Sequence, residues 1–201
     1  MAAEVILPKI GAWLMELKNI SKAFDGKQVL SDISIVVPKG SRVLISGVSG
    51  RGKTTLLRIM LGLIKPDSGE VIGAFSKQAA VFQEDRLQAE FTPVTCVKMV
   101  CAPHVSRQEI CAQLGEVGLA EHIDKPTGKL SGGQRRRVAI VRAVMSDADA
   151  IFFDEPFTGF DGKTKLTVID YINRHTNGKT LVFVSHAAED AELLKAKEIR
   201  I

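Results

Sequence analysis

The chain has 201 residues, of which 45% are hydrophobic and 25% charged, and its net charge is +4. This length suits a single domain with a full hydrophobic core. The charge excess is too small to indicate nucleic-acid binding, which requires a concentrated basic face. No apolar run reaches the roughly 18 residues of a membrane helix, and the three cysteines include no CxxC pair that would suggest a disulfide framework or a zinc site.

The N-terminal part of the chain predicts an extension followed by a β region. Residues 1–14 are apolar but carry charges and a proline, so they do not resemble a signal peptide and are expected to be an N-terminal extension. The compact domain is then expected to span 15–201. The segments 14–24 and 29–37 flank an Asp-Gly turn and predict two strands.

A glycine-rich loop follows a short apolar run at 41–46, which predicts a buried strand, and precedes a predicted helix at 53–63. The loop reads Gly47, Val48, Ser49, Gly50, Arg51, Gly52, Lys53, Thr54, Thr55. This is the full P-loop pattern, in which backbone N–H groups cradle phosphates at a helix N-terminus. Lys53 is expected to reach the β- and γ-phosphates, Thr54 to ligate Mg²⁺, and Thr55 to lie near the α-phosphate. By itself, this motif predicts a P-loop NTPase and does not specify the nucleotide.

Two further strands end in residues that suit hydrolysis. The run 150–153 leads into Asp154 and Glu155. Asp154 is expected to hold Mg²⁺ through its water shell, and Glu155 to act as general base on the attacking water. His186 follows the apolar run 181–185 and can hold the water and the γ-phosphate in line. A solvated acidic turn and a surface histidine are the alternatives.

Two single residues complete the predicted site. Gln83 ends the predicted strand 79–83, and its amide can reach Mg²⁺ or the attacking water. Phe24 can stack on the adenine ring. Taken alone, Gln83 could equally make a structural hydrogen bond, and Phe24 could be an ordinary core aromatic.

The pattern from 92 to about 147 changes to helical, with Ser106 and Glu109 spaced as a capping box. This region is expected to be a helical subdomain inserted between two halves of the sheet. Alternation of strand and helix on either side predicts parallel pairing. The predicted class is therefore α/β, a P-loop NTPase with a mainly parallel sheet core, an N-terminal antiparallel β region and a helical subdomain.

A second glycine-rich segment lies before the predicted helix 134–145 and reads Leu130, Ser131, Gly132, Gly133, Gln134. Its hydroxyl and bare N–H groups form a second candidate phosphate site. One γ-phosphate cannot easily contact both sites of one chain, which favours a head-to-tail dimer with ATP between two chains. The arginines at 135–137 lie near that interface, although a solvated helix face is expected for at least two of them.

In this order, the motifs resemble those of the ATP-binding subunit of an ABC transporter, over about 15–201. By that resemblance, residues 130–134 are the signature acting in trans, Asp161 belongs to the D-loop and His186 is the switch histidine. The segment 81–87 is similar to importers of the nitrate, sulfonate and taurine type. Val48 and Arg51 depart from the residues common in the family P-loop.

The resemblance implies an ATPase that energises solute transport through a separate membrane permease by ATP-driven dimer closure. Import is favoured, because a small separate subunit is typical of importers in the family. The expected partners are a second ATP-binding subunit, identical or a close paralogue, a permease contacting roughly 83–101, and a solute-binding protein; nucleic acid is not expected. The expected location is cytoplasmic, at the inner face of the cell membrane.

Two alternatives belong to other functional classes. A soluble ABC-type ATPase acting on nucleic acid or ribosomes would usually carry coiled-coil insertions, tandem cassettes or basic extensions, and none is seen in this sequence. A regulatory module that holds ATP without turnover is disfavoured by the full set of Lys53, Asp154, Glu155 and His186.

Overall fold

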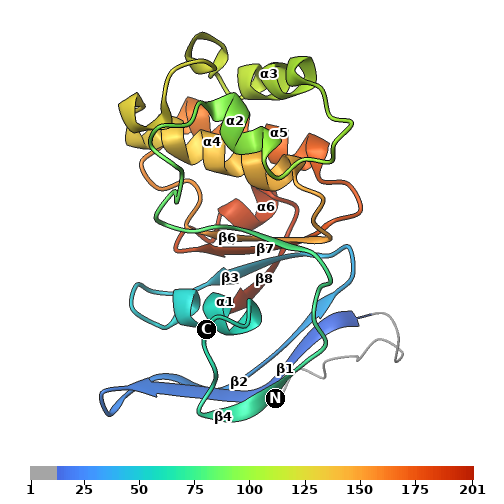
Figure 1. Cartoon of the computed structure of the whole chain (residues 1–201). Helices are drawn as coiled ribbons and strands as arrows, with labels where there is room; N and C mark the ends of the chain where they lie inside the picture. Colours follow the sequence, from blue (N-terminus) through green and yellow to red (C-terminus); the bar gives the residue numbers. More distant parts are fainter. Residues whose placement is uncertain (1–12) are drawn as a thin grey trace.

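The computed structural model describes residues 13–201, which form two sheets and a helical layer (Figure 1). The elements are, in chain order, β1 (Trp13–Phe24), β2 (Lys27–Pro38), β3 (Arg42–Ser46), α1 (Lys53–Met60), β4 (Ser68–Ile72), β5 (Gln78–Val81), α2 (Pro93–Lys98), α3 (Arg107–Glu116), the short 3₁₀ turns Ala120–His122 and Thr127–Lys129, α4 (Gly132–Met145), β6 (Ala150–Asp154), α5 (Gly162–His175), β7 (Thr180–Ser185), α6 (Asp190–Leu193) and β8 (Lys197–Arg200). Within residues 13–201, no helix has the length and apolar character needed to cross a bilayer.

The central sheet has five strands in the order β5-β6-β7-β3-β8, and all its pairings are parallel. The predicted parallel core is therefore confirmed. The segments that follow β5, β6, β7 and β3 leave the same edge of the sheet, because parallel strands share their carboxyl ends there. This topology brings together four loops that lie far apart in the sequence.

Strict alternation along the central strands divides the core into two clusters. In β6, Ile151 and Phe153 pack toward helices α2 to α5, whereas Ala150 and Phe152 pack toward α1 and the N-terminal sheet. Phe153 stacks on Phe183 of β7 with ring centroids 4.6 Å apart. Both faces of these strands are covered, as expected for short runs that are apolar without interruption. Burial of β6 on both faces fixes the position of Asp154, the last residue of this strand.

The three-stranded sheet pairs β2-β1-β4 antiparallel and lies beyond α1, on the opposite side of the central sheet from α2, α3, α4 and α5 (Figure 1). Its first strand begins at Trp13. Residues 1–12 of the expected extension lie outside the described residues. The predicted N-terminal antiparallel region is present.

The helical region lies between β5 and β6, which are adjacent in the sheet. Its insertion therefore leaves the sheet continuous. The predicted capping box begins α3: Ser106 Oγ accepts from the Glu109 N–H, and the Glu109 carboxylate accepts from the Ser106 N–H. Helix α2 packs against both α3 and α4, so the helical region is one packed layer.

Candidate nucleotide site

A cavity of about 300 Å³ lies at the carboxyl edge of the central sheet. It is lined by Val29, Ser49, Gly50, Gly52, Lys53, Thr54, Thr55, Gln83 and Glu155. Residues from three of the predicted motifs, separated by about 100 positions in the sequence, thus share one space. Its polar lining and its place after parallel strands suit a phosphate-bearing ligand.

The P-loop adopts the backbone that its glycines permit. Gly52 has φ 84° at the N-cap of α1, and a Cβ there would lie 2.8 Å from Leu30 Cδ2. Glycine is required by both the left-handed backbone and the close packing. The Lys53 ammonium group folds over the loop and donates to the carbonyls of Gly47 at 2.8 Å and Val48 at 3.1 Å. The loop therefore holds a buried cation beside its N–H groups.

Thr54 lines the cavity and contacts Asp154 behind it: Thr54 Oγ1 donates to Asp154 Oδ1 at 2.9 Å. Asp154 is only 1% exposed, and this desolvation raises the pKa of its carboxyl group although the Thr54 bond acts in the opposite direction. A hydroxyl and a carboxylate oxygen at this distance fit Mg²⁺, which takes few protein ligands and completes its shell with water and phosphate. A bound cation would offset the cost of keeping the negative charge of this carboxylate buried.

The buried carboxylate yields a prediction about stability. Asp154→Asn should raise the Tm of nucleotide-free protein at pH 7, by about 2–4 °C for each kcal/mol of desolvation relieved. A raised folded-state pKa favours the native state at low pH, and this benefit is lost as pH rises through that pKa. The variant's advantage should therefore shrink toward acid pH. Calorimetry in EDTA across pH checks this, and a lower Tm at pH 7 would contradict it.

Glu155 and His186 form a pair above the cavity. Glu155 Oε2 lies 2.9 Å from His186 Nδ1, and the Glu155 side chain is 13% exposed against 67% for His186. Glu155 has the left-handed φ of 48°, and its N–H donates to the Val184 carbonyl at 2.9 Å. Non-glycine residues rarely adopt this backbone, and such strain clusters at functional sites. The turn directs Glu155 toward His186 while Asp154 stays in the sheet.

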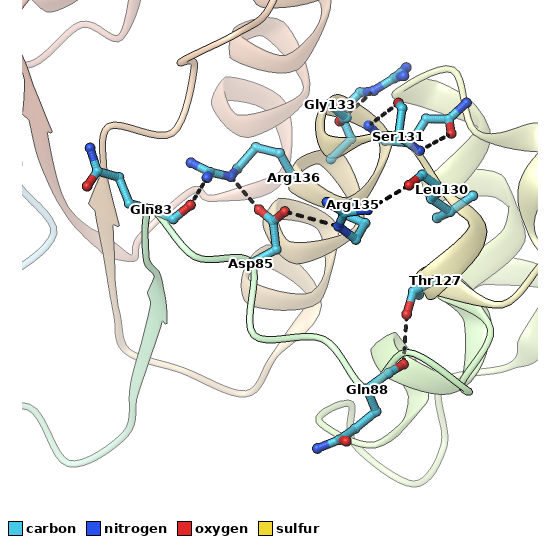
Figure 2. Close-up of polar contacts among 11 residues, drawn as sticks. Gln83, Asp85, Gln88, Thr127, Leu130, Ser131, Gly133, Arg135 and Arg136 are labelled. Carbon is cyan, nitrogen blue, oxygen red and sulfur yellow. Dashed lines mark hydrogen bonds and ion pairs between the residues drawn. The ribbon is translucent and has the colours of Figure 1, made fainter.

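Gln83 lies just beyond β5 and contributes to the cavity wall. Its backbone carbonyl accepts a hydrogen bond from Arg136 of α4, and Figure 2 shows its side chain extending away from that contact. Contact of its amide with Mg²⁺ or the attacking water stays a prediction. Gln83 does make a structural hydrogen bond, which was the alternative, but through its backbone carbonyl and not through its side-chain amide.

The segment 130–134 lies at the start of α4 and does not line this cavity. Ser131 is the N-cap: its Oγ accepts from the Gln134 N–H at 3.2 Å, and Gln134 Oε1 accepts from the Ser131 N–H at 2.8 Å. The Gln134 amide also contacts His122 at 2.8 Å. Ser131 and Gly132 are exposed, so this segment is accessible at the surface of the chain that carries it.

The expected solvated face of arginines is only partly present, because Arg135 and Arg137 are half-buried and also bind backbone carbonyls. Arg135 donates to the Leu130 carbonyl at 2.7 Å, and Arg137 donates to the Val117 carbonyl at 2.8 Å. Arg136 is only 8% exposed. Each of the three guanidinium groups donates to a backbone carbonyl, because these carbonyls lie within reach of the long side chains. Charge runs alone could not reveal these partners.

Asp161 and Phe24 do not line the nucleotide cavity. Asp161 is the N-cap of α5 and accepts from the Thr164 N–H at 2.9 Å, which helps to lower the pKa of its carboxyl group. Phe24 ends β1, is 43% exposed and does not line the cavity described above. The core-aromatic alternative for Phe24 is therefore wrong, while stacking on adenine stays a prediction.

Residues 30–158 match the family model described as ABC transporter. The aliphatic sulfonates import ATP-binding protein SsuB 2 of Pseudomonas syringae pv. syringae is 32% identical over 96% of this chain and 71% of its own length. SsuB 2 of Agrobacterium fabrum is 35% identical, over 95% and 78%. The spermidine/putrescine import ATP-binding protein PotA of Fusobacterium nucleatum subsp. nucleatum is 31% identical, over 88% and 52%.

Among solved structures, an ATP-binding cassette in a dimeric post-hydrolysis state with ADP and Pi is 27% identical, with a TM-score of 0.81 and 94% of each chain covered. The fold and the ordered site define a P-loop ATPase of the cassette class. The chain belongs to the ABC transporter family, as an ATP-binding subunit that hydrolyses ATP. These relatives confirm the resemblance to sulfonate-type importer subunits and do not favour the nucleic-acid alternative.

Proposed function

We propose that two such subunits, identical or closely paralogous, close head to tail around ATP and reopen on hydrolysis, driving solute import through a separate permease. The observation that carries this proposal is the separation of two candidate phosphate-binding segments. The P-loop, Gln83 and Glu155 line one cavity, whereas Ser131 and Gly132 lie outside it and are exposed. A dimer would supply each nucleotide with both segments.

Within one subunit, the P-loop N–H groups and Lys53 hold the β- and γ-phosphates. Thr54, Asp154 and Gln83 would hold Mg²⁺, which neutralises charge that develops on the phosphates. Glu155 accepts a proton from the attacking water at its free carboxylate oxygen. His186, 2.9 Å away, fixes the direction of that carboxylate.

The permease surface that we propose lies on the helical layer, beside α2. A cavity of about 370 Å³ there is lined by Val94, Thr95, Lys98, Met99, Arg107 and Ile110. Met99 is 65% exposed, and the neighbouring Val100 is 40% exposed. Apolar side chains gathered at a groove with basic edges suit a helix with an apolar face and an acidic flank.

Met99→Asp should abolish co-purification of the permease, because it places a charge in the apolar groove. ATP turnover by the isolated subunit should stay within about twofold of wild type, since Met99 does not line the nucleotide cavity. Leu166→Asp is the matched control, because Leu166 is a similarly exposed apolar residue at 55% but lies on α5. Equal loss with both variants, or retention with Met99→Asp, would place the permease elsewhere.

Anionic organic solutes of the sulfonate class are the proposed cargo, delivered by a solute-binding protein, and the subunit is proposed to work at the cytoplasmic face of the membrane. The sulfonate-import relatives support this class. Similar identity to a polyamine-import subunit supports the proposal that cargo is selected by the partners.

The decisive test is purification of the tagged full chain from detergent-solubilised membranes of its source. A multispanning partner together with a solute-binding protein is the expected result. Recovery of ribosomes, nucleic acid or soluble proteins alone would overturn the transport proposal. Uptake assays with the recovered complex, comparing sulfonates with polyamines, then test the proposed cargo.

A further inference from the structure

One arginine of α4 reaches two residues of the nucleotide site at once. Arg136 Nε donates to Asp85 Oδ1 at 2.6 Å, Nη1 donates to the Glu155 carbonyl at 3.1 Å, and Nη2 donates to the Gln83 carbonyl. Figure 2 shows the guanidinium between the segment that carries Gln83 and the helix that follows the signature. All three nitrogens of the guanidinium are thus engaged.

This guanidinium is held by a partially buried ion pair. The side chains of Arg136 and Asp85 are 10% and 14% exposed, and Arg135 Nε approaches the other Asp85 oxygen at 3.7 Å. Asp85 lies two residues after Gln83, so the pair fixes the segment at both its backbone and a side chain. A poorly solvated pair of this kind is costly to break on one side only.

The contact with Glu155 bears on the strained turn. At φ 48°, Glu155 requires outside support, and its two backbone polar groups receive it: the N–H from the Val184 carbonyl and the carbonyl from Arg136. Strained residues persist only when their surroundings fix them in this way. The direction of the Glu155 carboxylate, and hence its contact with His186, depends on that support.

We propose that Arg136, oriented by Asp85, is a positioning residue for hydrolysis. It holds Gln83 and Glu155 in a fixed position relative to each other. The proposal rests on the roles assigned above to Gln83 and Glu155. Arg136 lies five residues after the N-cap Ser131 on one continuous helix. Any shift of α4 when the signature engages a partner's nucleotide would therefore reach Gln83 and Glu155 through this side chain.

The structure provides a matched control for a purely structural role. Arg142 lies on the same helix, is partly buried, and its Nη1 donates at 3.1 Å to the Arg86 carbonyl in the same loop. None of its described hydrogen bonds involves Gln83 or Glu155. Loss of Arg142 should weaken the attachment of the loop at Arg86 without changing the contacts that hold Gln83 and Glu155.

The experiment compares steady-state ATPase kinetics of the full chain for Arg136→Gln, Arg136→Lys and Arg142→Gln. Arg136→Gln should lower kcat by about 10- to 100-fold, because misplacement of about 1 Å can cost 10²-fold. KM for ATP should change less than threefold. Arg136→Lys should recover part of kcat, and Arg142→Gln should stay within threefold of wild type at a comparable Tm.

A double variant tests whether Arg136 acts through Gln83. Gln83→Ala with Arg136→Gln should lose less than the product of the two single losses. Multiplicative losses, an equal effect of Arg142→Gln, or an unchanged kcat in Arg136→Gln would overturn the proposal. If Arg136→Gln does not fold, Arg136→Lys and Asp85→Asn carry the test, each expected to lower kcat with KM nearly constant. Unimpaired turnover in Glu155→Gln would instead sink the proposed role of Glu155.

Discussion

Glu155→Gln should lower kcat for ATP hydrolysis by about 10²–10⁴-fold, the range that general-base assistance contributes. The amide keeps the shape of the side chain and can still contact His186, whose Nδ1 lies 2.9 Å from Glu155 Oε2. It cannot accept a proton from water. ATP affinity should stay within about threefold, because Asp154, Thr54 and the P-loop are unchanged. Single-turnover hydrolysis and equilibrium ATP binding measure the two quantities separately.

Glu90→Gln is a suitable control, since Glu90 is exposed and does not line the nucleotide cavity. It should leave both turnover and affinity as in wild type. Persistence of near-normal turnover in Glu155→Gln would refute the general-base role and leave His186 or a phosphate oxygen as the proton acceptor. A joint loss of affinity and turnover would show that the carboxylate supports binding instead.

The parallel core was predictable because its strands are buried on both faces. The runs ending at Ser46, Asp154 and Ser185 are short, apolar and followed at once by polar motifs, a combination that few other structures produce. Once these strands are taken as parallel, the convergence of their loops follows from topology. The expected grouping of P-loop, Gln83 and Glu155 therefore needed no side-chain coordinates.

Two strands and one side-chain network were not predictable in the same way. The strand β4 begins with Ser68 and Gly69, which indicate a turn, and it forms only because it pairs with β1. The strand β8 is mostly charged and lies at the sheet edge, where its register depends on β3. Arg136 contacts residues 51 and 19 positions away, and no local pattern encodes such partners.

Lys53→Ala should weaken ATP binding by about 10- to 100-fold, because each charge-assisted hydrogen bond contributes about 1.5–3 kcal/mol. Lys53 is 7% exposed, and its ammonium group already lies against the carbonyls of Gly47 and Val48. It is thus held at the loop before any phosphate arrives, and little entropy remains to be lost on binding. Titration with a fluorescent ATP analogue gives the Kd directly.

The same substitution separates a phosphate role from a purely structural one. If Lys53 only stabilised the loop, Lys53→Ala would lower the Tm and weaken adenosine and ATP alike. A phosphate role requires that ATP lose affinity strongly while adenosine does not, because only ATP presents the β- and γ-oxygens. Lys39→Ala, which removes an exposed ammonium from the turn before β3, should change neither. Unchanged ATP affinity in Lys53→Ala would refute the assignment, since no other lysine or arginine lines the cavity described here.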